Sequence, residues 1–388
     1  MAGGRGVRRG GRLRGLARLI PLARIPQRRG GSGVIATLAA LLALAGTGTS
    51  ASQGEDPVSK LGDRQLAGLR IVTGFEGESP PSSLIRMIRE GRVSGVILFS
   101  DNFDTESEAK NLIASLKDIR RPEGLRQPLL VAIDQEGGQV KRLPGPPSVS
   151  AASMGSAGRR ESSRQGRRTG AYLDRLGFNL DLAPVLDLAI PGGEIRRTDR
   201  GFARSPSRVI RTGLAFAKGL RKGGVASAAK HFPGFGRARL NTDDTSQKVR
   251  SAQGAPGNND ERPFVAYSRK VGDVVMLANA VYPALDKGKP AGLSRPIASR
   301  ELRRRVGFEG VSITDSLDAA AITDIGSPGE VAEMGARAGT DVLLFSNLSS
   351  AAEAAEALAR ELRAKRLNRQ GFRASVRRIL DLRASLRG

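Results

Sequence analysis

The sequence PLLVAIDQ at residues 128–135 is the clearest indication of how the chain folds. Its apolar residues are consecutive rather than alternating, and the run ends in the polar residues Asp134 and Gln135. A short run of this kind is typical of a strand buried on both faces, as strands are in a parallel sheet covered by helices. Similar runs recur along the chain, at residues 69–75, 94–100, 178–186, 225–231, 273–280, 310–314 and 341–346.

Amphipathic stretches separate these runs. Helical spacing of apolar residues is clearest at residues 81–92, 106–120, 163–176 and 207–222. Buried strands in series with helical connections predict an α/β fold, a single (β/α)8 TIM-type barrel. An open doubly wound sheet is the alternative. Such a sheet often carries a glycine-rich phosphate turn after its first strand, and GFEGESPP at residues 74–81 is not that motif.

The barrel domain is predicted to occupy residues 53–388, with no second domain or internal repeat. After the eighth strand, residues 349–367 are rich in Ala, Glu and Arg, and residues 372–386 have apolar side chains at helical spacing. Both segments are predicted as outer helices that close the barrel.

The first part of the chain has the pattern of an export signal. An apolar run at residues 34–45 follows Arg28 and Arg29 and precedes the small residues 46–51. A basic flank, a short apolar core and a small-residue end predict a leader over residues 1–52 and a secreted or envelope-associated protein. An uncleaved membrane anchor is the alternative, although the run is short for a span.

The composition argues against several classes of protein. The formal net charge is +25, but nine arginines lie in the first 30 residues, and 3 Tyr with no Trp offer few platforms for stacking bases. We therefore expect no nucleic-acid partner; a basic surface could hold the protein near an anionic wall polymer. Cys is absent and His231 is the single histidine, which excludes Cys/His zinc sites and Cys–His nucleophiles. Neither a metal nor a cofactor is predicted.

Polar phrases follow several predicted strands. They are DQEGGQVKR at residues 134–142, TDRGF at 198–202, KHFPGFG at 230–236 and DSLD at 315–318. Because the working residues of such barrels sit at the C-terminal ends of the strands, these phrases are the candidate site.

In order and spacing these phrases resemble the N-terminal barrel domain of glycoside hydrolase family 3, specifically its single-domain β-N-acetylhexosaminidases. The resemblance extends from about residue 69 to residue 386, with further matching phrases at residues 95–99, 182–187 and 338–341. It implies a retaining glycosidase with a carbohydrate substrate, and it implies that Asp315 is the nucleophile. The substrate-contacting positions that it implies are Asp134, Arg142, Arg200, Lys230 and His231.

The chemistry of a retaining glycosidase fits these residue types. One ionised carboxylate forms a covalent intermediate, and an acid/base acts on the leaving-group side. Each residue also has a plainer interpretation. Asp315 could cap a helix, Asp134 and Arg142 could form an ion pair, and His231 could be a core imidazole. His231 as the base of a Ser-His-Asp triad is disfavoured because no Gly-x-Ser-x-Gly motif accompanies it.

The chain departs from the family pattern at the acid/base. Where the resembling enzymes have a second histidine this chain has Phe235, and their Asp-x-His pair reads Asn-Thr-Asp at residues 241–243. Asn279 likewise stands where a histidine is common in the family that the chain resembles.

Three possibilities follow from the missing histidines. Asp243 or Asp244 could serve as acid/base if its pKa is raised. Good leaving groups could depart without an acid. Alternatively, the barrel could bind carbohydrate without hydrolysing it. A retaining exo-glycosidase acting on N-acetylglucosamine-containing cell-wall sugars and a non-catalytic carbohydrate-binding barrel therefore both remain open.

Overall fold

The computed structural model describes residues 57–246 and 259–386. The predicted leader lies outside these residues. In the described ranges, no helix combines the length and the apolar character needed to span a membrane.

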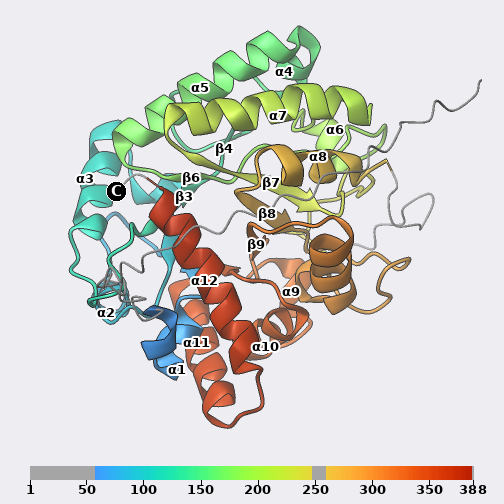
Figure 1. Ribbon diagram of the computed structural model, residues 1–388. Coiled ribbons are helices and arrows are strands. Elements are labelled where there is room, and N and C mark those ends of the chain that lie inside the picture. Colours follow the sequence, from blue (N-terminus) through green and yellow to red (C-terminus); the bar gives the residue numbers. More distant parts are fainter. Residues whose placement is uncertain (1–56, 247–258, 387–388) are drawn as a thin grey trace, which may run out of the picture. The chain divides into compact units, whose positions relative to one another are not determined.

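Eight parallel strands form the centre of the fold (Figure 1). Around the sheet the order is β10-β1-β2-β3-β6-β7-β8-β9. A parallel bridge between Ile313 and Val342 joins the two ends of this order, and Thr314 N donates to Val342 O at 3.0 Å. The strands are β1 (Ile71–Thr73), β2 (Gly95–Ile97), β3 (Leu130–Ile133), β6 (Leu180–Asp181), β7 (Ala226–Phe232), β8 (Val274–Leu277), β9 (Val311–Thr314) and β10 (Leu343–Phe345). The predicted (β/α)8 barrel is confirmed.

Helices alternate with the strands and cover the outside of the barrel. The main ones are α1 (Asp63–Gly68), α2 (Ser82–Arg89), α3 (Glu106–Lys117), α4 (Ala151–Ala157), α5 (Arg159–Leu176), α7 (Pro206–Gly223), α8 (Arg262–Lys270), the π-helical η4 (Pro296–Arg305), α10 (Pro328–Ala338), α11 (Leu348–Arg363) and α12 (Arg369–Ser385). Short turns of helix lie at η1 (Pro57–Lys60), η2 (Ser100–Asn102), α6 (Glu194–Arg197), η3 (Ala291–Leu293) and α9 (Ala320–Thr323). Local sequence explains several helix starts. Thr105 caps α3 and Ser327 caps α10, each in a capping box with a glutamate three residues later.

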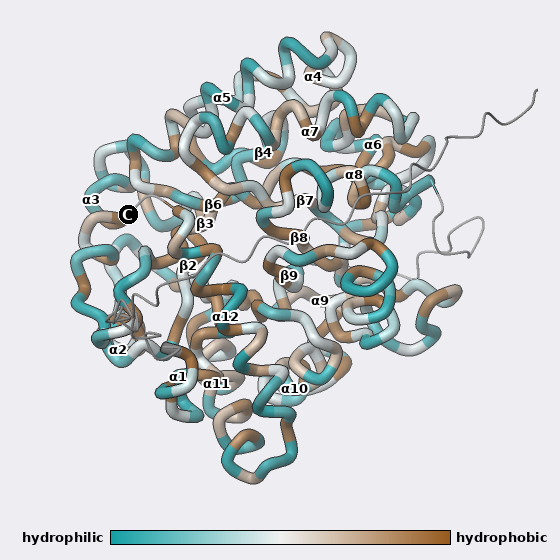
Figure 2. The backbone as a smooth tube through the Cα atoms, viewed as in Figure 1, coloured by the Kyte–Doolittle hydropathy of each residue, from teal (hydrophilic) through white to brown (hydrophobic). Residues whose placement is uncertain are grey.

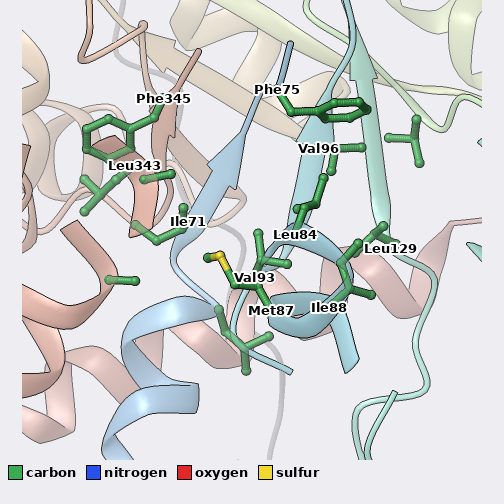
Figure 3. Packing of buried hydrophobic residues seen from close by; sticks show 14 of the residues in the cluster. Ile71, Phe75, Leu84, Met87, Ile88, Val93, Val96, Leu129, Leu343 and Phe345 are labelled. Carbon is green, nitrogen blue, oxygen red and sulfur yellow. The ribbon is translucent and has the colours of Figure 1, made fainter. Parts of the chain in front are cut away.

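Apolar side chains fill the barrel and the layer around it. The interior holds branched residues from the strands, such as Val72, Leu130 and Ile313. A second layer packs between the strands and the helices. Figure 3 shows part of it, where Leu84 of α2 lies beside Val96 and Ile88 lies beside Leu129. In Figure 2 the central strands are largely brown, whereas teal recurs along the outer helices.

Helix α12 does not lie where the sequence predicted. Instead of joining α11 on the outside, it crosses the N-terminal end of the barrel, where its Ile379 is fully buried among the interior side chains (Figure 1). Arg383 donates to Gln127 O at 2.8 Å and Pro128 O at 2.7 Å, just before β3. The helix therefore closes the bottom of the barrel and leaves the opposite end open for the site.

Candidate active site

The predicted site residues meet at the C-terminal ends of the strands. Asp134 follows β3, Lys230 and His231 lie near the end of β7, and Asp315 follows β9. A cavity of about 300 Å³ opens there. Its polar lining comes from Asp134, Arg142, Asp243, Asp315, Ser316, Asp318 and Ser346, and its apolar lining includes Phe99, Leu182, Met276 and Leu344.

A network of alternating charges lies beside the cavity, and two of its members, Asp134 and Arg142, line it. The Lys230 ammonium lies 2.7 Å from both Asp134 Oδ1 and Glu136 Oε1. Arg200 binds Glu136 with both arms of its guanidinium, at 2.9 and 2.8 Å, and Arg142 Nη2 lies 3.5 Å from Asp134 Oδ2. The hairpin of β4 (Gln135–Gly137) and β5 (Val140–Lys141) carries Arg142 back to Asp134. The ion pair between Asp134 and Arg142 is therefore present, as the plainer interpretation expected, and it belongs to a larger network.

The network holds its carboxylates ionised. Burial opposes charge on Asp134, but the Lys230 and Arg142 cations outweigh that effect, and the pKa of Asp134 lies below its usual value. Burial also opposes charge on Glu136, and there Arg200 and Lys230 lower the pKa to about 2. For Lys230, burial is outweighed by these two carboxylates, which raise its pKa above the ordinary range. Both acids and the lysine are therefore charged at neutral pH.

A further carboxyl group lies beneath this network. Asp181, the last residue of β6, is fully buried, and its Oδ1 accepts a hydrogen bond from the backbone of Gln135 at 3.0 Å. Burial raises the pKa of Asp181 well above its usual value, although the nearby Lys230 opposes the shift. Burial therefore favours the neutral form of Asp181 more than that of an ordinary aspartate. Sequence analysis missed it because an acid within an apolar strand carries no motif.

His231 is fixed by a buried aspartate. Its Nδ1 lies 2.7 Å from Asp187 Oδ2, and the same carboxylate accepts from the backbone N–H of His231 at 3.0 Å and of Phe235 at 2.6 Å. An ionised carboxylate only accepts, so Nδ1 carries the proton and Nε2 remains an acceptor in the neutral ring. The Phe235 ring lies 5.6 Å from the imidazole, in the place of the missing second histidine. The phrase at residues 182–187 gave the one sequence signal for Asp187.

Asp315 is partly exposed to the cavity and caps no helix. Helix α9 begins five residues later, and Asp315 Oδ1 accepts only from the adjacent Ser316 N–H, at 2.9 Å, among the described residues. Burial raises the pKa of Asp315, with the Asp243 charge acting in the same direction and His231 and Lys230 opposing. The ionisation of Asp315 therefore depends on the charges of three neighbours, Asp243, His231 and Lys230.

Of the two aspartates proposed to replace the histidine, only Asp243 reaches the cavity. Its Oδ2 accepts from Asn241 Nδ2 at 3.0 Å, and its carbonyl accepts from Ala320 N at 3.2 Å at the start of α9. Both aspartates are exposed, but Asp244 does not line the cavity. The loop that contains Asp243 is thus anchored to α9, and the Asp243 carboxylate shares the cavity with Asp315.

Asn279 supports the site rather than lining it. Its Nδ2 donates to Ser316 O at 2.5 Å, which ties the end of β8 to the loop after β9. Asp318 does line the cavity; its Oδ2 accepts from the backbone of Ser346 at 2.7 Å and of Asn347 at 2.9 Å. In residues 57–246 and 259–386, no group of three His, Asp or Glu side chains is placed to hold a metal ion.

Known proteins share this architecture. Residues 63–382 match the glycosyl hydrolase family 3 N-terminal domain. The chain is 35% identical over 331 residues to an uncharacterized secreted glycosyl hydrolase of Arthroderma benhamiae, which covers 82% of this chain and 93% of that protein. It is also 35% identical over 269 residues to a β-hexosaminidase of Neisseria meningitidis serogroup C, covering 66% of this chain and 72% of that enzyme.

A solved structure extends the likeness to three dimensions. A glycoside hydrolase family 3 β-N-acetylglucosaminidase from Paenibacillus sp. superimposes with a TM-score of 0.78 at 30% identity, over 83% of this chain. This chain spans 62% of that structure. Since the family match covers nearly all of the barrel, the chain belongs to glycosyl hydrolase family 3 and is a glycosidase built on that family's N-terminal domain.

Proposed function

We propose that this protein is an exported, retaining β-N-acetylhexosaminidase that acts on N-acetylglucosamine-containing cell-wall sugars, with Asp315 as its nucleophile. The observation that carries the proposal is that Asp315, Asp134 and Arg142 line one cavity at the open end of the barrel. The substrate class is supported by the relatives, since the Neisseria protein is a β-hexosaminidase and the Paenibacillus structure is a β-N-acetylglucosaminidase.

The charge network would hold the sugar. Asp134 is ionised and accepts hydrogen bonds from hydroxyl groups, while Arg142 and Lys230 donate to the sugar oxygens. Arg200 uses Nε and Nη2 on Glu136, so its contact with substrate would come from Nη1. His231 would contact the sugar through Nε2, because its Nδ1 is bonded to Asp187.

The reaction has two steps. In the first, an Asp315 carboxylate oxygen bonds to the anomeric carbon while the glycosidic C–O bond breaks, and the leaving oxygen takes a proton from the acid. In the second, water attacks the anomeric carbon, gives its proton to the same residue acting as base, and Asp315 leaves as a carboxylate. His231 and Lys230 favour the ionised form of this nucleophile and oppose the effect of burial, which raises the pKa of Asp315.

Asp243 is the proposed acid/base. It lines the same cavity as Asp315, and the hydrogen bonds of its loop to α9 hold it there. Asp244 remains the second candidate, as an exposed donor one residue further along the loop.

A non-catalytic carbohydrate-binding barrel is the alternative function. The observation that favours it is Phe235, an apolar ring beside His231 where the resembling enzymes have a second histidine. This alternative predicts saturable sugar binding that survives Asp315→Asn, with no product from the parent protein.

Trapping the covalent intermediate separates the two functions. A fluorinated, slowly turned-over N-acetylglucosaminide should attach to the peptide that contains Asp315, as seen by mass spectrometry, and Asp315→Asn should prevent the attachment. An absence of both label and turnover across several aryl glycosides, alongside normal sugar binding, would establish the non-catalytic barrel instead. Release of N-acetylglucosamine from muropeptides then tests the proposed source of substrate.

Export is proposed from the predicted leader and from the secreted Arthroderma relative. The mature protein should begin near residue 53. Recovery of the intact chain from the cytoplasm alone, measured by its N-terminal mass, would contradict export.

A further inference from the structure

A second cavity lies among the helices that cover the barrel, away from the proposed catalytic site. It has a volume of about 720 Å³ and is enclosed by η4, the end of α10 and the first turns of α12. It shares no lining residue with the cavity that contains Asp315. The charged residues lining it are all basic within the described chain, namely Lys289, Arg295, Arg303, Arg337 and Arg378.

Two of these cations share one buried carboxylate. Asp341 is fully buried and binds Arg303 through Oδ2 and Arg378 through Oδ1, the latter at 2.6 Å. Burial opposes charge on Asp341, but the two arginines outweigh it and hold its pKa below the usual value. Burial also lowers the pKa of the adjacent Arg70 to about 10, and the Arg378 charge adds to that shift. The wall of the cavity therefore has more positive charge than its carboxylate neutralises.

The remaining cations are largely uncommitted. Lys289 and Arg295 are exposed and form no ion pair with any described residue. Arg337 donates Nη1 to Arg366 O at 2.8 Å, and its nearest carboxylate, that of Glu361, is 3.7 Å away and also paired with Arg366. The N-terminus of α12 adds partial positive charge, because backbone N–H groups point out of a helix start.

We propose that this cavity binds a phosphate-bearing ligand. Its volume falls in the range of about 300–1,000 Å³ typical of small-molecule sites. A terminal phosphate offers three free acceptor oxygens and up to two negative charges, and each phosphodiester of a polymer offers two free oxygens and one charge. Either group can engage cations from separate helices at once. Leu293, Met334 and Phe372 supply apolar surface for the carbon body of the ligand. The phosphate could belong to a free polyol phosphate or to a repeating phosphodiester polymer.

Calorimetric titration tests the site and separates the two sources. Glycerol 3-phosphate and poly(glycerol phosphate) serve as probes at about 0.15 M salt, where diffuse surface attraction is largely screened. The Lys289→Gln/Arg295→Gln variant should bind at least tenfold more weakly, because it removes the two uncommitted cations. Its melting temperature and its hydrolysis of a small aryl glycoside should stay unchanged. Arg337→Gln gives an independent test on α10. Tight binding of glycerol 3-phosphate would identify the ligand as a free phosphate. Binding of poly(glycerol phosphate) alone would identify it as a phosphodiester chain.

A matched control removes the same charge elsewhere. Arg211→Gln/Lys218→Gln takes two cations from a separate basic groove of about 430 Å³ on α7. This variant should bind both probes as the parent does. The proposal is overturned if neither probe gives saturable binding, if both double variants lose affinity equally, or if citrate binds as tightly as the phosphates.

Discussion

At the scale of single residues, the ionisation of each group in the site depends on the charges of its neighbours. Asp315 is surrounded by one acid, Asp243, and by the basic groups of His231 and Lys230. Asp187 orients His231 through two hydrogen bonds and accepts a third from the backbone N–H of Phe235. Glu136 links Lys230 to Arg200. The acid limb of activity should therefore respond to substitutions of residues that never touch the sugar.

Asp243→Asn is expected to affect activity in two ways. If Asp243 donates the proton, kcat/KM for a poor leaving group should fall about 10²–10⁴-fold, with little loss for a good one, and azide should restore turnover on the good leaving group. Removing its charge should also lower the pKa of Asp315, because that charge raises it. Since Asp315 acts ionised, the acid limb of kcat/KM should move to lower pH.

Asp244→Asn is the matched control, because it removes the same charge one residue away from the cavity lining. It should leave both the leaving-group dependence and the acid limb in place. If instead only Asp244→Asn lowers kcat/KM selectively for the poor leaving group, the acid/base role belongs to Asp244.

At the scale of elements, two helices approach each other through glycine. Gly166 and Gly170 of α5 face Gly219 and Gly223 of α7, and each pair is spaced by four residues. A Cβ at Gly170 would lie 2.4 Å from the Leu220 carbonyl oxygen. Such contacts leave no room for a methyl group without moving a backbone, so this crossing depends on the absence of side chains.

Gly170→Ala should therefore destabilise the protein, by about 1–3 kcal/mol of unfolding free energy. The gain of about 1 kcal/mol in helix propensity only partly offsets the clash. Gly371→Ala in α12 is the control, because a Cβ there meets its neighbours at ordinary distances of 3.6 Å or more. Thermal melting compares the two variants; an unchanged melting temperature for Gly170→Ala would show that α5 and α7 can separate without cost.

At the scale of the whole molecule, stability should depend on pH through buried carboxylates. The pKa of Glu136 is lowered from 4.5 to about 2, and those of Asp134 and Asp341 are lowered as well. A lowered folded-state pKa contributes stability that is complete above the unfolded pKa and is lost as pH falls through the folded one. Asp181 acts in the opposite sense, because its pKa is raised.

The free energy of unfolding should thus fall between about pH 4.5 and pH 2, with Glu136 alone accounting for a loss on the order of 3 kcal/mol. Urea denaturation at a series of pH values measures this loss. Glu136→Gln, compared with the exposed-site change Glu353→Gln, should flatten the curve in that window. Equal slopes for the parent and Glu136→Gln would show that the network contributes nothing to acid stability.

The barrel, its eight strands and the polar residues at the strand ends could all be predicted from the amino-acid sequence. Runs such as residues 128–135 report burial and element type locally, and parallel strands bring their C-terminal ends together in any closed barrel. The clustering of Asp134, Lys230 and Asp315 therefore followed from their positions at strand ends. Periodicity does not identify which surface an apolar helix will cover, and for this reason α12 was placed outside rather than beneath the barrel.

Only the tertiary structure decided which polar groups face one another. That Asp243 rather than Asp244 lines the cavity depends on how the loop packs against α9, about 80 residues further along the chain. The pairing of Lys230 with Asp134 spans 96 residues and that of His231 with Asp187 spans 44. Such contacts arise from the closure of the barrel, and they set the charge states on which the chemistry depends, because burial and neighbouring charge are properties of the folded chain.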